Sequence, residues 1–187
     1  MRGLPRLSPL GVDLDCVRCA LSRGRTQVVP GAGDPRARLM LVGEAPGATE
    51  DELGEPFVGR AGKVLDACLE DAGLARGGVW IANAVRCRPP DNRAPLPGEI
   101  ASCTFQLDAE LLAVRPRVVV LLGSSAARAV LGHPVKVDDE RGEAHAVRRT
   151  GLDVLCLVTY HPQGVVYRPS ARGRLVEDLV RGRALTF

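Results

Sequence analysis

Residues 39–47 read Leu-Met-Leu-Val-Gly-Glu-Ala-Pro-Gly, a short apolar run that ends in a turn rich in glycine and proline. Similar apolar runs lie at 79–85, 118–122 and 154–158, and each ends in Gly, Pro or polar residues. Short, uninterrupted runs of Val, Ile and Leu are typical of strands that are buried on both faces, as in a parallel sheet. The pattern therefore predicts four parallel strands.

Helical spacing of apolar residues occurs between and after these runs, at 61–72, 98–114, 124–131 and 170–181. Alternating strands and helices predict an α/β fold, a three-layer α/β/α sandwich around a mainly parallel four-stranded sheet. Ligand sites in such sheets lie beyond the carboxyl ends of the strands. We therefore expect the functional residues to be those that directly follow the strands.

The length and composition are those of an ordinary globular domain. The chain has 187 residues, of which 45% are hydrophobic and 25% are charged, so we expect a single domain over 1–187 and a monomer. No apolar run approaches the ~20 residues that a membrane span needs. Residues 1–6 lack the apolar core of a signal peptide. We expect a cytoplasmic protein with no membrane association.

The net charge of +3 is too small to indicate nucleic-acid binding by itself. Lys63 and Lys136 are the only lysines, and the remaining residues of the Lys and Arg count are arginines. Arginine suits planar contacts with phosphate groups, but a GC-rich coding sequence produces the same bias. Charge leaves both explanations open.

Six cysteines in a reducing compartment favour metal ligands or core residues over disulfides. Cys16 and Cys19 form a C-x-x-C pair on a polar, irregular stretch. Zinc sites, iron–sulfur sites and thioredoxin-type redox sites all use such a pair. The redox interpretation is weak, because that motif normally follows a strand and opens a helix.

Cys87 and Cys103 are the candidates for the two further ligands that would close a metal site. Cys87 follows the second predicted strand, just before an Arg-Pro-Pro turn that ends strand pairing and frees the thiol. Cys103 lies early in the second predicted helix on an apolar face, so a core position is its alternative. Cys68 and Cys156 fit a core position better. The predicted division is four ligands and two core cysteines.

Three further residues are candidates for a ligand pocket, each with a structural alternative. Gly43 and the turn after it let a ligand approach the backbone, or they form a plain strand-to-loop turn with solvated acids. Phe57, on a loop, either packs on the core or stacks on a base. Asn83 ends a strand between apolar residues, where it bonds to the backbone or reads the edge of a bound base.

His161 differs from the other two histidines in its setting. It directly follows the last predicted strand and precedes Pro162, which makes the turn rigid. His133 and His145 have no such setting, and we expect both at the surface.

Four motifs occur in this chain in a fixed order. They are Gly-Glu-Ala-Pro-Gly at 43–47, Pro-Phe-Val-Gly-Arg-Ala-Gly at 56–62, Asn-Ala-Val-Arg-Cys-Arg-Pro-Pro-Asp-Asn-Arg at 83–93, and Thr-Tyr-His-Pro at 159–162. With the four cysteines interleaved, this order resembles the family-four uracil-DNA glycosylases over nearly the whole chain. Each motif alone is a weak signal, but their combination is specific.

The resemblance implies the uracil-glycosylase fold and a DNA-repair enzyme. Such an enzyme flips uracil out of DNA and hydrolyses its N-glycosidic bond, which leaves an abasic site. The resemblance also implies a structural [4Fe–4S] cluster bound by Cys16, Cys19, Cys87 and Cys103. DNA that contains uracil is the implied partner.

The resemblance further implies how the base is held. Gly43 lets the base approach the backbone, Phe57 stacks on it, and Asn83 reads its Watson–Crick edge. His161 donates a hydrogen bond to uracil O2, where negative charge accumulates. Glu50 faces the 5-carbon of the base and excludes the methyl group of thymine.

The sugar and the phosphates have their own implied contacts. Glu44 lies near the sugar, where it stabilises the developing cation or orients the attacking water. The implied phosphate contacts are two arginine side chains and the backbone amides at a helix start. The residues are Arg60, Ser124, Ser125 and Arg168.

Two comparisons with the family pattern matter. The family usually has small apolar residues and an arginine after His-Pro, whereas residues 163–168 read Gln-Gly-Val-Val-Tyr-Arg. The wedge that fills the gap left by the flipped base is therefore Val165, Val166 or Tyr167. A sister class becomes covalently linked to DNA through a histidine in an inserted loop. No histidine lies between residues 57 and 131, which argues against that class.

Two other functions remain open from the sequence. One is a nucleic-acid-binding metal-cluster protein without glycosylase activity. The other is a redox carrier that uses Cys16 and Cys19, which would need neither a pocket acid nor His161. Colour separates the metals, because a zinc protein is colourless and an iron–sulfur protein is brown.

Overall fold

A computed structural model describes residues 5–187 of the chain. The prediction about a signal peptide was made on residues 1–6. Residues 1–4 of that stretch lie outside the described residues. No helix within 5–187 is both long enough and apolar enough to cross a membrane.

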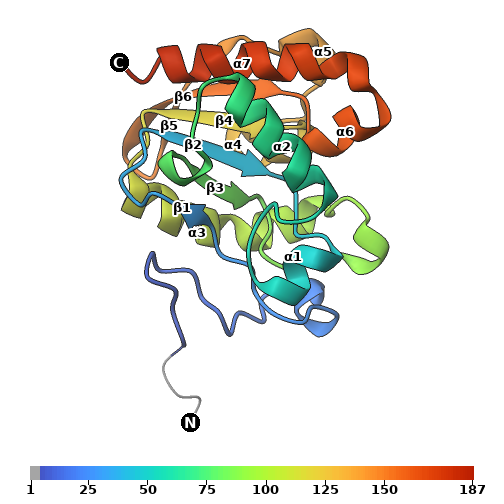
Figure 1. The fold of residues 1–187 in the computed structure, drawn as a ribbon. Helices are drawn as coiled ribbons and strands as arrows, with labels where there is room; N and C mark the ends of the chain where they lie inside the picture. The colour runs from blue at the N-terminus through green and yellow to red at the C-terminus, as the bar shows by residue number, and fades with distance from the viewer. Residues whose placement is uncertain (1–4) are drawn as a thin grey trace.

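The centre of the structure is a six-stranded sheet in the order β1-β3-β2-β4-β6-β5 (Figure 1). Its four inner strands run parallel to one another. In spatial order they are β3 (Trp80–Asn83), β2 (Leu39–Gly43), β4 (Val118–Leu122) and β6 (Leu152–Thr159). These are the four predicted strands, and β2, β3 and β4 are buried along their whole length because helices cover both faces.

The prediction of a four-stranded sheet was wrong in its count, because it missed two antiparallel edge strands. β1 (Ala32–Gly33) pairs with β3, and β5 (Ala144–Arg149) pairs with β6. β1 has only two residues, too few to produce a pattern. β5 alternates exposed and half-buried residues, so it contains no continuous apolar run.

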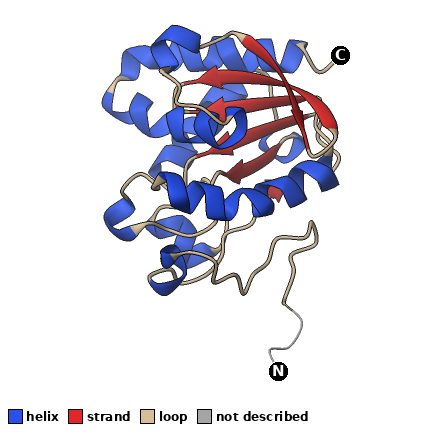
Figure 2. Cartoon of the chain, turned by 180° about the vertical axis from the view of Figure 1, so that it is seen from behind, coloured by secondary structure: helices blue, strands red, loops and turns tan. Residues whose placement is uncertain are grey.

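Helices lie on both faces of the sheet (Figures 1 and 2), which confirms the three-layer α/β/α architecture. α2 (Arg60–Asp71) and α7 (Arg172–Ala184) bury their leucines against one face. α3 (Pro97–Val114) and α4 (Ser124–Leu131) pack on the opposite face. These four helices are the four that the apolar spacing predicts.

Three short helices were not predicted: α1 (Ala48–Leu53), α5 (Val137–Glu140) and α6 (Pro162–Tyr167). Each is too short to display a helical period of apolar residues. Single 3-10 turns lie at Ala20–Arg23 (η1), Arg76–Gly78 (η2), Pro90–Asn92 (η3) and Pro169–Ala171 (η4). α1 follows β2 and α6 follows β6, so both lie at the carboxyl edge of the sheet.

The cysteines are divided between two kinds of environment. Cys68 and Cys156 are fully buried in the two apolar clusters that flank the sheet, which confirms both as core residues. Cys87 and Cys103 lie in a third cluster, which joins the N-terminal segment to α3 and to the residues after β3. Cys19 packs against this third cluster.

Candidate active site and cysteine site

A pocket of about 680 Å³ opens at the carboxyl ends of the parallel strands. Glu44 follows β2, Asn83 ends β3 and His161 follows β6. Phe57, between α1 and α2, and Tyr167, at the end of α6, also line the pocket. The fold thus brings residues that are far apart in the sequence to the sheet edge that the sequence pattern indicates.

Gly43 allows two pocket residues to approach each other across the end of β2. A Cβ atom at this position would lie 2.3 Å from Phe57 Cζ and 2.6 Å from Asn83 Oδ1. Both distances are far shorter than real contacts of a Cβ atom, so any side chain here would displace the ring or the amide. Glycine is required because it leaves that space to the pocket.

Phe57 is held in an unusual backbone conformation by Glu50. Its φ of 54° lies in the left-handed region, which is uncommon for residues other than glycine, and its side chain is only 5% exposed. Glu50 Oε1 accepts hydrogen bonds from the amides of Val58 at 3.1 Å and Gly59 at 2.7 Å, while Oε2 accepts from Gly47 at 3.1 Å. The carboxylate therefore ties the Phe57 loop to α1, and it is buried rather than solvated.

Asn83 presents an unpaired acceptor. The residue is 2% exposed, and its Oδ1 atom has no hydrogen-bond partner in the described chain. A buried acceptor without a partner costs about 1–3 kcal/mol. The alternative of a backbone bond to this oxygen does not hold, and the atom is available to a ligand that donates a hydrogen bond.

His161 is neutral and its tautomer is defined. Burial lowers the pKa of His161 to about 4. Its Nδ1 atom accepts a hydrogen bond from the Gln163 amide at 3.1 Å, so the proton of the neutral ring lies on Nε2. The ring lies against Phe57, with 5.7 Å between the two ring centroids. The site therefore contains a neutral N–H donor beside an aromatic ring.

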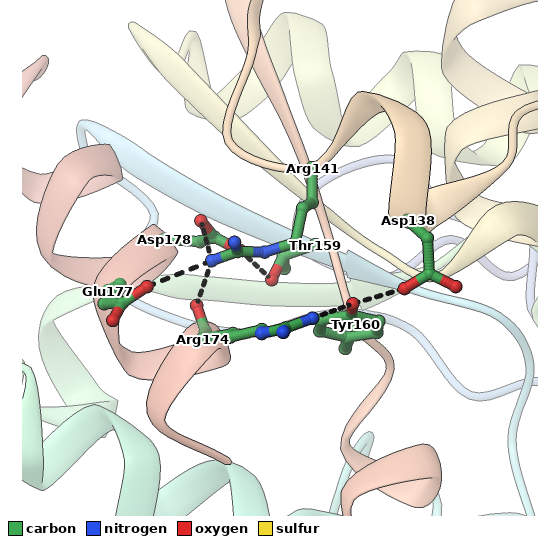
Figure 3. A network of polar contacts seen from close by, with 7 residues as sticks. All are labelled: Asp138, Arg141, Thr159, Tyr160, Arg174, Glu177 and Asp178. Carbon is green, nitrogen blue, oxygen red and sulfur yellow. Dashed lines mark hydrogen bonds and ion pairs between the residues drawn. The ribbon is translucent and has the colours of Figure 1, made fainter. Parts of the chain in front are cut away.

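A polar network anchors the strand end that carries His161 (Figure 3). Thr159 donates its hydroxyl to Asp178 Oδ2 at 2.6 Å, and the next residue, Tyr160, donates to Asp138. These bonds tie the end of β6 to α7 and to α5, so they fix the backbone just before the histidine. Further members of the network are Arg141, Arg174 and Glu177.

Glu44 lines the pocket, and the predicted phosphate contacts differ in whether they do so. Glu44 Oε2 accepts a hydrogen bond from Ser125 Oγ at 2.5 Å. Arg60 lines the pocket and is exposed, whereas Ser124 and Arg168 are exposed but do not line it. Only the hydroxyl of Ser125 is engaged with a pocket residue.

The three wedge candidates differ sharply in exposure. Val165 is 4% exposed and belongs to the core cluster under α2 and α7, so it is not available to DNA. Val166 is half-buried. Tyr167 is 76% exposed and lies at the pocket, which leaves it as the candidate best placed to contact DNA.

The loop after Cys87 adds pocket residues to which the sequence analysis gave no role. Pro89, Asp91, Asn92 and Arg93 line one side of the pocket. Asp91 and Asn92 both have a positive φ, and Arg93 is paired with Glu99 at 2.7 Å. The motif at 83–93 was the available signal, since it runs directly from Asn83 into this loop.

The prediction that the two remaining histidines lie at the surface is confirmed for one of them. His133 is exposed. His145 is partly buried on β5, with its Nε2 atom 3.8 Å from Glu140.

The N-terminal loop with Cys16 and Cys19 is docked onto the helix that carries Cys103. Asp13 and Gln106 exchange two hydrogen bonds, from the Asp13 amide to Oε1 at 2.7 Å and from Nε2 to the Asp13 carbonyl at 3.0 Å. The Arg18 guanidinium lies 3.8 Å from the centre of the Phe105 ring. These contacts lie on either side of Cys16, and Arg18 directly precedes Cys19, so both C-x-x-C cysteines are held beside the helix that carries Cys103.

Two arginines lie near the thiols of Cys87 and Cys103. Burial raises the pKa of Cys103 to about 12 and raises that of Cys87, while Arg86 and Arg25 respectively act in the opposite direction. Arg25 Nη1 also donates to Cys87 Sγ at 3.0 Å. Cys16 interacts electrostatically with both Cys87 and Cys103, so the thiols share one environment.

Arg86 is fully buried and has unused donors. Its Nη2 atom bonds to Glu110 at 2.9 Å, but its Nε and Nη1 atoms have no partner in the described chain. Arg86 lies next to Cys87 in sequence and near Cys103 in space. Within 5–187 no group of three His, Cys, Asp or Glu residues is arranged to hold a metal ion. The donor set fits an anionic iron–sulfur group better, because it combines four thiols with unpaired guanidinium N–H groups.

Comparisons with known proteins agree with this geometry. Residues 30–180 match the uracil DNA glycosylase superfamily. The chain belongs to this superfamily. Within it, the chain is 40% identical to a type-4 uracil-DNA glycosylase of Pyrobaculum aerophilum over 169 residues, which cover 88% of this chain and 86% of that protein.

Two further relatives carry the same type-4 name. The protein of Archaeoglobus fulgidus is 41% identical over 88% of this chain and 85% of its own length. The protein of Sulfurisphaera tokodaii is 37% identical over 93% of this chain and 81% of its own length. The chain is therefore similar to type-4 members over nearly its whole length.

Proposed function

We propose that this protein is a uracil-DNA glycosylase of type 4, which hydrolyses the N-glycosidic bond of uracil in DNA and leaves an abasic site. The observation that carries the proposal is the unpaired Asn83 Oδ1, buried close to Gly43, which Phe57 also approaches. Uracil presents an N3–H donor beside its O4 acceptor, and one carboxamide satisfies both. Phe57 stacks on the same base.

The bond to the sugar breaks as uracil leaves as an anion and the deoxyribose becomes cationic. His161 Nε2–H donates to uracil O2, and because the ring is already neutral near pH 7 it donates this hydrogen bond without giving up the proton. Glu44 stabilises the sugar cation or orients the attacking water. Glu50 acts on the base through the Phe57 loop that it holds, and its place in the pocket wall also supports exclusion of thymine.

The DNA backbone and the gap in the base stack need further contacts. Arg60, the amides at Ser124 and Ser125, and Arg168 are the proposed phosphate contacts. Tyr167 fills the space left by the flipped base, since an exposed aromatic ring can stack between neighbouring bases.

Cys16, Cys19, Cys87 and Cys103 are the proposed ligands of a [4Fe–4S] cluster. The cluster braces the N-terminal loop and the loop after β3 against α3, and it takes no part in bond cleavage. Arg25, which already donates to Cys87 Sγ, and Arg86, which has two unpaired N–H groups, would supply hydrogen bonds to sulfur atoms at this site.

We also propose a single domain over 1–187 that acts as a monomer in the cytoplasm. All six cysteines are free, which supports a reducing compartment. A cluster protein that binds nucleic acid without cutting it is not favoured, because the pocket combines an unpaired amide oxygen, a neutral N–H donor and a carboxylate.

An absorption spectrum and a cleavage assay on the same sample test both parts. We expect broad absorption in the visible blue, and alkali-labile cleavage of an oligonucleotide only where it carries uracil. A colourless protein with bound zinc would contradict the cluster but not the glycosylase. A coloured protein that leaves uracil in place would contradict the glycosylase but not the cluster.

A further inference from the structure

Glu44 has a long side chain at a position where its carboxylate must face the substrate. It follows β2 at the pocket wall and remains partly exposed. A glutamate in such a place samples many rotamers, and ordering a long side chain costs conformational entropy. A carboxylate that must face the reacting sugar therefore needs a second contact to hold it.

Ser125 supplies a contact of this kind from the neighbouring strand. β2 and β4 pair in parallel, and α4 begins directly beyond β4 with Ser124 and Ser125. The Ser125 hydroxyl donates to Glu44 Oε2 at 2.5 Å, a short bond of the kind that forms between a hydroxyl and a carboxylate. The other oxygen of Glu44 stays available to the pocket.

The hydroxyl of Ser125 has no competing task in the described chain. Gly123 is the N-cap of α4, and no side chain caps this helix. Ser125 contacts Glu44 without lining the pocket itself. Its neighbour Ser124 is exposed and makes no such bond, which leaves Ser124 to the phosphate contact proposed above.

We propose that Ser125 is a positioning residue that fixes the orientation of Glu44 toward the sugar. The inference rests on the proposed glycosylase function and adds a role to Ser125 that is separate from phosphate binding. It separates the Ser125 hydroxyl, which serves the bond-breaking step through Glu44, from the backbone amides of Ser124 and Ser125, which serve DNA binding.

The first test compares single-turnover cleavage with DNA affinity. Ser125→Ala is expected to slow uracil release by about 10-fold or more, as loss of a hydrogen bond to a charged group implies. Affinity for an oligonucleotide with 2′-fluoro-deoxyuridine, which resists cleavage, is expected to change less than about twofold. Ser125→Thr keeps the hydroxyl and is expected to restore most of the rate.

Thr104→Ala is the matched control, because it removes a helix hydroxyl that bonds only to the Ala101 carbonyl of its own helix. Weaker DNA binding with an unchanged rate in Ser125→Ala would contradict the proposal and make Ser125 a phosphate contact.

The second test asks whether Ser125 acts through Glu44. In a Glu44→Ala background, Ser125→Ala is expected to cause no further loss of rate, because the partner is already absent. Rate losses that multiply would mean that Ser125 acts independently, and the proposal would fall.

The wild type, Ser125→Ala, Glu44→Ala and the double variant are then compared by thermal unfolding without DNA. The fall in melting temperature of the double variant is expected to differ from the sum of the two single falls. This holds even if the wild type proves inactive on uracil. An inactive wild type with coupled melting temperatures would therefore contradict the proposed function alone, whereas additive melting temperatures would contradict the Ser125 contact.

Discussion

The pocket and the cysteine site each contain buried polar atoms without a partner, and the two sets are of opposite kind. Within residues 5–187, four buried side-chain atoms have no hydrogen-bond partner, and three of them belong to these two sites. Asn83 contributes an acceptor to the pocket, whereas Arg86 contributes two donors beside the cysteines. The pocket thus suits a ligand that donates a hydrogen bond, and the cysteine site suits an anionic ligand that accepts one.

The largest effect is expected at the cysteines. Cys87→Ala or Cys103→Ala should remove the visible absorption and destabilise the protein, because the loops held by the cluster lose their common anchor. Cys68→Ala and Cys156→Ala should keep the colour, since both thiols lie in the core away from that site. Absorption spectra of the four purified variants decide the division. Loss of colour in either core variant would overturn it.

His161→Ala tests the role of the pocket, as distinct from the cysteine site. Removal of the Nε2–H donor should cut single-turnover cleavage by ~10²–10³-fold, the usual cost of losing an oxyanion donor, with a much smaller change in DNA affinity. The absorption of the cluster should be unchanged, because the histidine lies in the pocket. Equal losses of binding and rate would mean that His161 contacts phosphate instead.

The neutral state of His161 predicts its behaviour in acid. An NMR titration of the imidazole should give a midpoint near pH 4 rather than near the ordinary value of about 6.5. Because the unfolded ring takes up a proton first, the folded state should lose stability as the pH falls from about 6.5 toward 4. A midpoint near 6.5 would contradict a buried, neutral donor.

The smallest effect concerns the unused donors of Arg86. Arg86→Gln combined with Glu110→Gln removes the buried pair without leaving one charge alone. If these two N–H groups donate to the sulfur atoms of the proposed cluster, the double variant should bleach faster in air. Arg149→Gln combined with Asp108→Asn removes a pair elsewhere and is the control. Equal bleaching rates in both double variants would remove Arg86 from the cluster site.

The parallel core of the fold was predictable because its strands are continuous apolar runs. β4 at Val118–Leu122 was predicted to the residue, since both of its faces are buried. β5 escaped prediction because one side of this edge strand faces solvent and half of its residues are histidine or arginine, so it contains no continuous apolar run. The sequence pattern thus reports burial, and strands without burial leave little trace in it.

Candidate site residues were predictable where a strand end or a motif marked them. The residues to which they form hydrogen bonds were not predictable. Asn83 and His161 follow buried runs, which is why their place at the pocket could be anticipated. The bond from Ser125 to Glu44 joins residues that are 81 positions apart, and no local pattern encodes such a pair. The anchoring of the Phe57 loop by Glu50 is equally invisible, because backbone amides can donate to any nearby carboxylate and no particular sequence marks them.

The central claim is that Asn83 reads uracil, and substitution of its amide tests this most directly. Asn83→Asp keeps an acceptor for uracil N3–H but opposes O4 with a second acceptor, while it can accept from the N4 amine of cytosine. Each mismatched buried group is worth ~1–3 kcal/mol.

The measurement is single-turnover cleavage of oligonucleotides that carry one uracil or one cytosine, by the wild type, Asn83→Asp and Asn83→Ala. We predict a large loss of uracil excision and a trace of cytosine excision by the Asp variant, and loss of both by the Ala variant. Wild-type rates on uracil from the Asp variant would mean that Asn83 does not touch the base, which would contradict the account.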